Sequence, residues 1–209
     1  MLLEKERAEV IEYCLKMAKD DLTVGTSGNI SVRVDDLVAI SPSGVDYDAM
    51  TPEQIVVTDL EGTIVEGTRS PSSELAMHLL VYAETDATAV IHTHPVYSTV
   101  VGTLAEETPT IHYMIALHGG AVRVAPYAPY GSVQLAENVA AAMKDRSAVL
   151  MQNHGAICFG DSLHSAYSRA LYLEWVCRVW VIARGIGDPH LLTSDQINVV
   201  IDKLGSYGQ

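Results

Sequence analysis

Two histidines separated by one residue, His92 and His94, are the most informative chemical feature of this sequence. They follow the apolar run 88–91, whose length and β-branched residues are typical of a buried strand. Since side chains alternate between the two faces of a strand, both imidazoles should project to the same side. Pro95 cannot continue a central strand, so we expect the pair at a strand end. Two converging neutral imidazoles form half of a metal site, whereas two unrelated polar residues in a loop are the alternative.

Other segments must supply the remaining ligands of a catalytic metal site, which also keeps one position open for substrate. His154 follows another apolar run, 147–152, and Gly155 after it lets the backbone come close to a ligand. Glu74 lies in the first turn of a predicted helix and could supply a carboxylate, while His78, one turn later on the same face, competes with it. The other histidines have no recognisable partner and are predicted to be surface or hydrogen-bonded core residues: His112, His118, His164 and His190.

Three loops of small residues precede the histidine pair in the chain: Gly28-Asn29, Ser43-Gly44 and Ser72-Ser73. Each combines hydroxyl or amide donors with backbone N–H groups that we expect to be free. The third lies at a predicted helix N-terminus, where unpaired N–H groups and the helix dipole favour an anion. One such loop is an ordinary turn. Three of them in front of a histidine pair predict a phosphate-binding site beside the metal.

The charge of the chain restricts its partners. Asp and Glu number 26 against 13 Lys and Arg, which gives a formal charge of −13 over 209 residues. Such a surface repels phosphate backbones and anionic lipids, so neither nucleic acid nor membrane is expected as a partner. Residues 1–20 are too charged for a signal peptide, and the apolar stretch 166–183 is interrupted by charged residues. Three widely spaced cysteines without a C-x-x-C motif predict reduced thiols in a cytoplasmic protein.

Several reaction classes lack their characteristic residues. None of the lysines follows an apolar strand, where a lysine that forms a Schiff base would be desolvated. The sequence also contains no G-x-S-x-G, no Walker loop and no strand-linked G-x-G-x-x-G. Imine, serine-hydrolase, nucleotide-phosphate and dinucleotide chemistry are therefore disfavoured.

Apolar periodicity and turn residues predict a single α/β domain over residues 1–209, with a mostly antiparallel central sheet flanked by helices. Antiparallel pairing is favoured because several consecutive predicted strands have no helix between them. Predicted helices cover 3–20, 71–84, 96–104, 133–144, 163–184 and 194–204, and predicted strands cover 30–34, 37–41, 55–58, 63–66, 88–91, 121–125, 147–152 and 157–159. Residues 109–120 are predicted to be irregular.

Taken together, the motifs occur in the order seen in the class II aldolase/adducin family, which the chain resembles from its first helix to its last few residues. The five motifs are Gly25-Thr26-Ser27-Gly28-Asn29, Ser41-Pro42-Ser43-Gly44, Pro71-Ser72-Ser73-Glu74, His92-Thr93-His94 and Asn153-His154-Gly155. Within that family, segments 111–116 and 203–208 are most similar to the branch that cleaves L-fuculose 1-phosphate.

The resemblance implies a three-layer fold and a homotetramer with active sites at subunit interfaces. It implies a zinc ion, with Mn²⁺ or Co²⁺ as alternatives, held by Glu74, His92, His94 and His154. Glu74 would also act as acid and base, Tyr113 would reach in from a neighbouring subunit, and Tyr207 in the C-terminal tail is the second tyrosine candidate. The substrate phosphate would lie on Thr26, Gly28, Asn29, Ser43, Gly44, Ser72 and Ser73.

On this basis the predicted function is metal-dependent, reversible cleavage of a ketose 1-phosphate, such as L-fuculose 1-phosphate, into dihydroxyacetone phosphate and a short aldehyde. An L-ribulose-5-phosphate 4-epimerase and a methylthioribulose-1-phosphate dehydratase are the alternatives within the family. A non-catalytic interaction module like the adducin head is the alternative of another class, and the ligand-type residues at all four metal positions argue against it. The sequence leaves the physiological ketose phosphate open.

Overall fold

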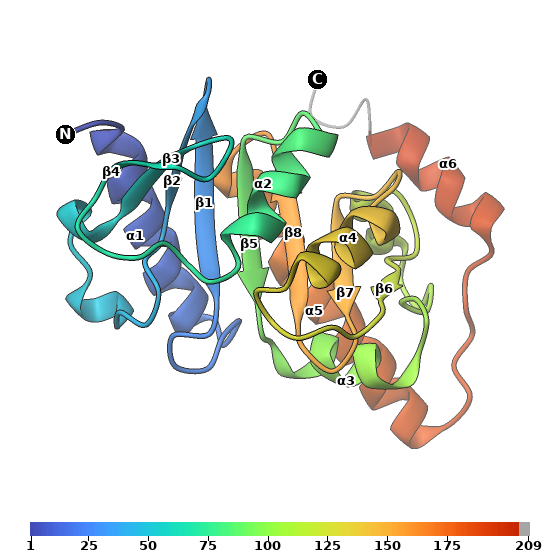
Figure 1. The fold of residues 1–209 in the computed structure, drawn as a ribbon. Coiled ribbons are helices and arrows are strands. Elements are labelled where there is room, and N and C mark those ends of the chain that lie inside the picture. Colours follow the sequence, from blue (N-terminus) through green and yellow to red (C-terminus); the bar gives the residue numbers. More distant parts are fainter. Residues whose placement is uncertain (205–209) are drawn as a thin grey trace.

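The computed structural model describes residues 1–204, which form one eight-stranded sheet with helices on both faces (Figure 1). The order of strands across the sheet is β4-β3-β2-β1-β5-β8-β7-β6. The strands are β1 Asn29–Val34, β2 Leu37–Ile40, β3 Val56–Asp59, β4 Ile64–Glu66, β5 Ala89–Thr93, β6 Val124–Ala125, β7 Ala148–Met151 and β8 Ala156–Gly160. The helices are α1 Glu4–Lys19, α2 Leu75–Glu84, α3 Val96–Leu104, α4 Val133–Ala142, α5 Leu163–Ile186 and α6 Ser194–Leu204, with short 3₁₀ helices η1 Tyr47–Ala49, η2 Pro52–Gln54 and η3 Tyr113–His118.

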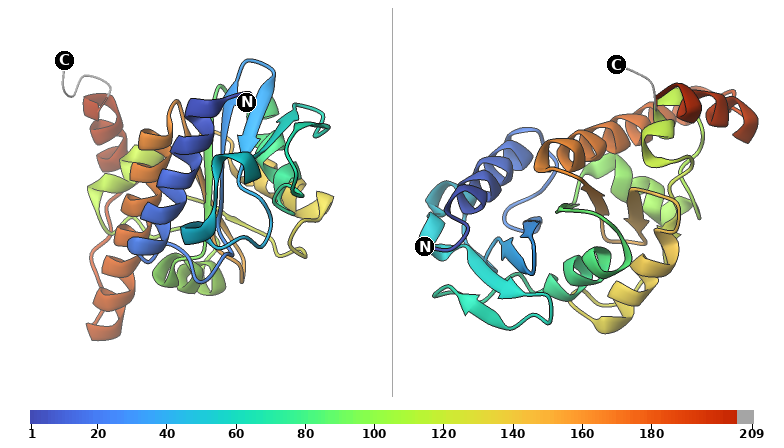
Figure 2. Two further views of the ribbon diagram at one scale, coloured as in Figure 1. Left: turned by 90° about the vertical axis from the view of Figure 1, so that its left-hand side faces the viewer. Right: turned by 90° about the horizontal axis from the view of Figure 1, so that it is seen from above.

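The helices make two outer layers. Seen from above, α1, α5 and α6 lie along one face of the sheet, and α2 and α4 lie along the other (Figure 2). Each face has its own apolar core, and neighbouring strand residues alternate between the two: Ala89 and Ile91 of β5 pack in the core under α1 and α5, whereas Val90 packs in the core under α2 and α4. The predicted three-layer α/β fold with a mostly antiparallel sheet is confirmed, since β6 with β7 is the one parallel pair among the described strands.

Strand β5 occupies the centre of the sheet, between β1 and β8, and all of its residues are buried. Its register brings three segments to one end of the sheet. Asn29 at the start of β1 pairs with His92, and Thr93 pairs with Ala156 directly after the β7–β8 turn. Residues far apart in the sequence therefore meet where β5 ends.

Three local predictions were wrong, and the first two concern residues 109–120 and strand β6. Residues 109–120 are not wholly irregular, because η3 forms there, with a His112 ring nitrogen accepting a hydrogen bond from the Met114 N–H at its start. Strand β6 covers only Val124–Ala125, although 121–125 was expected.

The helix predicted from residue 71 also begins later. Segment 70–72 pairs with residues 41–43, directly after β2, through Ser43 N–H to Ser70 O and Ser72 N–H to Ser41 O. Helix α2 therefore starts at Leu75, which leaves Glu74 at its N-cap position instead of in its first turn.

Two expectations from composition can be compared with the fold. Within residues 1–204, no helix is both long and apolar enough to span a membrane. The three cysteines are buried and unbridged, as predicted for core thiols.

Candidate metal centre and adjoining pocket

Four side chains that can bind a metal converge at the end of β5. One ligand-type atom from each of Glu74, His92, His94 and His154 lies within 4.8 Å of all the others. The His92 Nε2 atom is 2.7 Å from His94 Nε2 and 3.0 Å from Glu74 Oε2, and His154 Nε2 is 3.5 Å from Glu74 Oε1. The expectation that both histidines of the pair would project to one side at a strand end is confirmed.

Backbone contacts position two of these histidines. His92 Nδ1 lies 2.9 Å from the carbonyl oxygen of Ala156 and donates to it, so Nε2 is the ring nitrogen that faces the cluster. His154 sits in the tight turn between β7 and β8, against the end of β5. A Cβ atom on the next residue, Gly155, would lie 2.2 Å from the carbonyl oxygen of Thr93, so only glycine allows this approach.

The electrostatics of the cluster suit a divalent cation. Burial, together with the neighbouring His92, lowers the pKa of His94 to about 3, and burial lowers the pKa of His154 to about 4. Burial acts to raise the pKa of Glu74. The neighbouring His92 and the amide of Asn29 outweigh burial, and the pKa of Glu74 lies well below its usual range. Neutral imidazoles and an ionised carboxylate are the protonation states that bind zinc and similar ions.

An unpaired oxygen supports the same interpretation. Glu74 Oε1 is buried and has no hydrogen-bond partner among the described residues, although it faces His154. A buried carboxylate oxygen left unpaired is costly, and a bound cation would satisfy it. The donor set of this cluster therefore fits a metal ion.

The structure separates His78 from the metal ligands. This residue is fully buried behind the cluster, where its Nε2 contacts Asn29 Oδ1 at 2.6 Å and its Nδ1 contacts Ser31 Oγ at 2.7 Å. Burial lowers its pKa to about 3. His78 is not part of the four-residue cluster, so of the two candidates on α2 only Glu74 reaches it.

The remaining histidines follow the prediction with one exception. His164 and His190 are exposed, and His112 accepts the hydrogen bond at the start of η3. His118 is buried with neither ring nitrogen bonded to a described residue, so the expectation of a hydrogen-bonded core histidine is wrong for it.

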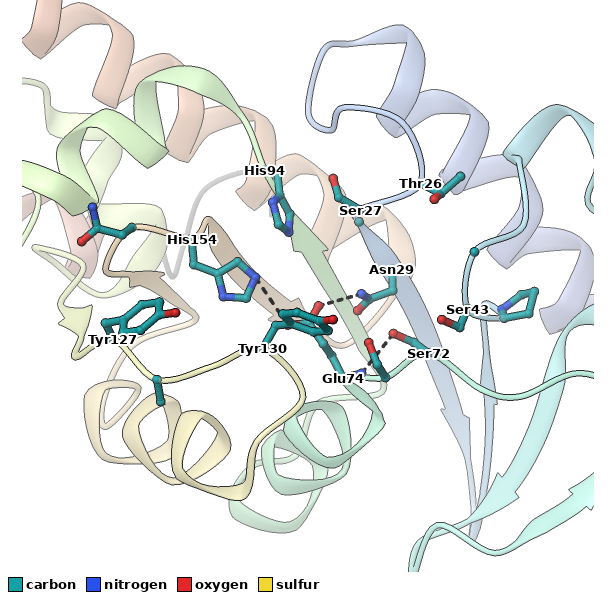
Figure 3. A pocket seen from close by; sticks show the side chains of 16 residues that line it. Thr26, Ser27, Asn29, Ser43, Ser72, Glu74, His94, Tyr127, Tyr130 and His154 are labelled. Carbon is teal, nitrogen blue, oxygen red and sulfur yellow. Dashed lines mark hydrogen bonds and ion pairs between the residues drawn. The ribbon is translucent and has the colours of Figure 1, made fainter.

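A pocket of about 460 Å³ adjoins the metal cluster (Figure 3). Glu74, His94 and His154 line it. In Figure 3, Thr26 and Ser43 lie on one side of the pocket, and His154 and Tyr127 lie on the other. The structure brings all seven residues expected at the phosphate into the pocket lining: Thr26, Gly28, Asn29, Ser43, Gly44, Ser72 and Ser73.

The expectation of free backbone donors was wrong at three of these positions. The N–H of Gly28 donates to Thr23 Oγ1 at 3.0 Å, and the N–H groups of Ser43 and Ser72 donate to backbone carbonyls at 3.1 Å. These bonds join the loops to neighbouring segments of the chain, so these three N–H groups are not available to a ligand.

Other donors of the same loops have no partner in the described part of the chain. They are the N–H groups of Gly44 and Ser73 and the hydroxyls of Thr26, Ser43 and Ser73. Gly44 has a φ of +67°, a conformation that glycine adopts without strain. Hydroxyl and N–H donors that converge on one pocket can hold a phosphate in an acidic protein.

Two tyrosines that sequence reasoning missed also line the pocket. Tyr127 and Tyr130 lie on the loop before α4 and are 60% and 74% exposed. Gly131 permits this placement, because a Cβ atom there would be 2.8 Å from the carbonyl oxygen of Ser73. The available signal was a pair of tyrosines in a short loop that contains two prolines, 126–131.

Tyr113 is not in this pocket. It begins η3, is 50% exposed, and lines a second hollow of about 1040 Å³ that His94 also borders. Within one chain the structure therefore does not bring Tyr113 to the pocket beside Glu74. Tyr207 lies outside the described residues.

Comparison with known proteins finds relatives along nearly the whole chain. The model of the family described as "Class II Aldolase and Adducin N-terminal domain" matches residues 8–181. The chain is 42% identical over its full length to the full length of a 5-deoxy-D-ribulose 1-phosphate aldolase of Bacillus thuringiensis serovar kurstaki. It is 40% identical to an L-fuculose phosphate aldolase of Escherichia coli, over 96% of this chain and 94% of that protein. A solved structure of L-fuculose 1-phosphate aldolase superposes with a TM-score of 0.94 at 41% identity, covering 96% of each chain.

Proposed function

Because the chain belongs to the class II aldolase and adducin family, we propose that it is a metal-dependent aldolase that reversibly cleaves a ketose 1-phosphate into dihydroxyacetone phosphate and a short aldehyde. The observation that carries the proposal is the convergence of Glu74 and three histidines beside a pocket lined with unpaired hydroxyl and N–H donors. We propose zinc as the ion, with Mn²⁺ or Co²⁺ as alternatives that the same donor set accepts.

Each group of the chain has a role that follows from its position in the pocket. Thr26, Ser43, Gly44 and Ser73 bind the phosphate. Thr26 and Ser43 lie on one side of the pocket, which leaves the carbon chain to extend toward His154 on the other (Figure 3). Glu74 moves the proton on the carbon next to the carbonyl, since its Oε1 accepts no hydrogen bond from the described residues. A cation on the four ligands would supply Lewis-acid stabilisation of the negative charge that develops on the substrate oxygens. No lysine lines the pocket, so an imine mechanism has no support there.

The similarity to two aldolases along nearly the whole chain supports aldol cleavage over the epimerase and dehydratase alternatives. The complete ligand set supports an enzyme over an interaction module. We propose 5-deoxyribulose 1-phosphate and L-fuculose 1-phosphate as the first substrates to test. They share the phosphate end and differ at the other end, and Tyr127 lies on the side of the pocket opposite Thr26 and Ser43 (Figure 3).

A substrate panel tests the proposed reaction. Release of dihydroxyacetone phosphate should be detected with at least one of 5-deoxyribulose, L-fuculose and methylthioribulose 1-phosphates, by coupling to its reduction by NADH. The unphosphorylated ketoses should have kcat/KM values about 10²–10⁴-fold lower, because they lose several hydrogen bonds to a charged group. Comparable values would contradict the phosphate assignment. Epimerised L-ribulose 5-phosphate without dihydroxyacetone phosphate would contradict the aldolase.

Metal content provides a test that needs no substrate. The purified protein should contain about one divalent ion per chain, and chelation should abolish activity. His94→Ala removes one of four ligands, so its occupancy should fall when measured by elemental analysis after dialysis. His190→Ala is the matched control, since His190 is exposed and not part of the cluster. Full occupancy and full rate in His94→Ala would contradict the metal centre.

We further propose that the protein is a homotetramer with active sites at subunit interfaces. Large apolar side chains are exposed along α5, among them Trp175, Ile182 and Ile186, and a neighbouring chain would cover them. We propose a sugar phosphate as the small-molecule partner, and neither nucleic acid nor membrane as a further partner. We also propose that the protein acts in the cytoplasm.

A further inference from the structure

A continuous line of buried hydrogen bonds runs behind the pocket and ends on Glu74. Tyr82 OH is 2.7 Å from Ser31 Oγ, which is 2.7 Å from His78 Nδ1. His78 Nε2 is 2.6 Å from Asn29 Oδ1, and Asn29 Nδ2 is 3.0 Å from Glu74 Oε2. All five residues are buried, and neither Tyr82, Ser31 nor His78 lines the pocket.

The identity of each donor follows from the carboxylate. An ionised Glu74 only accepts, so the Asn29 amide must donate to it and present its oxygen to His78. His78 Nε2 must then carry a hydrogen. In a neutral imidazole the other nitrogen accepts, so Nδ1 accepts from the Ser31 hydroxyl. The Ser31 oxygen in turn accepts from Tyr82.

The hydrogen on His78 Nε2 and the carboxylate of Glu74 together fix which way the Asn29 amide faces. With a donor behind it, the amide oxygen turns away from the pocket and the NH₂ group turns toward Glu74. One of its N–H bonds holds Oε2, and the second is left for a ligand of the pocket that Asn29 lines. The opposite orientation would set the amide oxygen against the carboxylate and would leave the His78 donor facing NH₂.

We propose that His78 is a positioning residue: its Nε2–H fixes the amide of Asn29, which in turn holds Glu74 Oε2 and leaves Oε1 for the metal and for proton transfer. Its effect on turnover rests on the proposed function, whereas its effect on the metal site does not. His78 itself touches neither substrate nor metal in this arrangement.

The first test reads the tautomer directly and requires neither mutation nor substrate. In the wild-type protein, long-range ¹H–¹⁵N correlation spectra of the histidine rings, assigned with His78→Gln, should show His78 as a neutral ring protonated at Nε2. A ring protonated at Nδ1 alone, or at both nitrogens near neutral pH, would overturn the proposal.

The second test uses three variants at His78 and Tyr82, two residues of the line of buried hydrogen bonds. His78→Leu removes the donor and should lower metal affinity or kcat about 10–100-fold, the range for residues that orient metal ligands. His78→Gln keeps an N–H donor in a similar place and should recover most of the loss. Tyr82→Phe removes a buried hydroxyl of the same line but leaves Asn29 bonded, and so it controls for lost stability.

Metal affinity, kcat and the thermal unfolding midpoint are measured for each variant. The positioning role is supported if His78→Leu loses more metal affinity or kcat than an equally destabilised Tyr82→Phe. His78→Gln should then recover most of that loss. Equal losses in the Leu and Phe variants, or wild-type values in His78→Leu, overturn it. If His78→Leu does not fold, the tautomer and the Gln variant decide. Absence of aldolase activity from the wild type would contradict the proposed function, while the metal-affinity comparison would still test His78.

Discussion

Replacement of Glu74 by glutamine is expected to slow turnover about 10²–10⁴-fold, the usual contribution of a general base. Solvent hydrogen exchange into dihydroxyacetone phosphate should stop as well, because that exchange requires a base at the carbon next to the carbonyl. The reason lies in the position of the carboxylate, since Oε2 is held by Asn29 and Oε1 has no hydrogen-bond partner in the described chain. Exchange can be followed by NMR in deuterated buffer without an aldehyde.

Metal occupancy must be measured in the same samples, because Glu74 is also a proposed ligand. Glu84→Gln, at the exposed far end of the same helix, is the matched control and should behave as wild type. A metal-replete Glu74→Gln protein that exchanged hydrogen at the normal rate would remove Glu74 as the base. His78 would not replace it, since that residue is fully buried and does not line the pocket.

Much of the metal centre could be predicted from local sequence patterns. The alternation of a strand places His92 and His94 on one side, and the apolar run before His154 followed by Gly155 indicates a second strand end. Both patterns depend only on residues adjacent in the chain. The sheet and most helices follow for the same reason. The strand alternation and the spacing of apolar residues are properties of short segments.

The sequence could not decide between Glu74 and His78, because residues four apart share one face of a helix. Two tertiary facts decided it. The segment before α2 pairs with residues 41–43, directly after β2, so the helix starts at Leu75 and Glu74 lies at the end of the sheet. Strand β1 places Asn29 opposite His92, and Asn29 then lies between Glu74 and His78.

The same kind of long-range pairing explains the errors at the phosphate loops and the missed tyrosines. Whether the N–H of Ser43 is free depends on Ser70, which is distant in the sequence. Tyr127 and Tyr130 reach the pocket because Gly131 lies against Ser73, a contact between two loops that no local pattern encodes.

Tyr113 lies among exposed apolar residues, which favours contact with another chain. It is half exposed, so it is not the packed core residue that its apolar neighbours would indicate. Trp175 and Leu171 of α5 border the same hollow and are also exposed. We propose that a neighbouring chain of the tetramer covers this face and that Tyr113 of one subunit serves the pocket of another.

Tyr113→Phe should separate the two halves of the proposed reaction. Removal of a proton from dihydroxyacetone phosphate requires the metal and Glu74 only, so hydrogen exchange should be retained. Making or breaking the carbon–carbon bond also requires a proton at the aldehyde oxygen, so aldol cleavage should fall about 10²-fold or more. Tyr172→Phe removes a hydroxyl from the same hollow and should leave both rates unchanged.

Mixing the two defective variants tests which subunit supplies the tyrosine. If Tyr113 acts across an interface, an oligomer reassembled from Glu74→Gln and Tyr113→Phe chains contains some pockets with a wild-type Glu74 and a neighbour's wild-type Tyr113. Such a mixture should recover part of the cleavage rate that each variant lacks alone. If Tyr113 served its own chain, every pocket would carry one defect and the mixture would stay inactive. Loss of exchange and cleavage together in Tyr113→Phe would instead assign it to folding or assembly, and Tyr207 would be the next tyrosine to test.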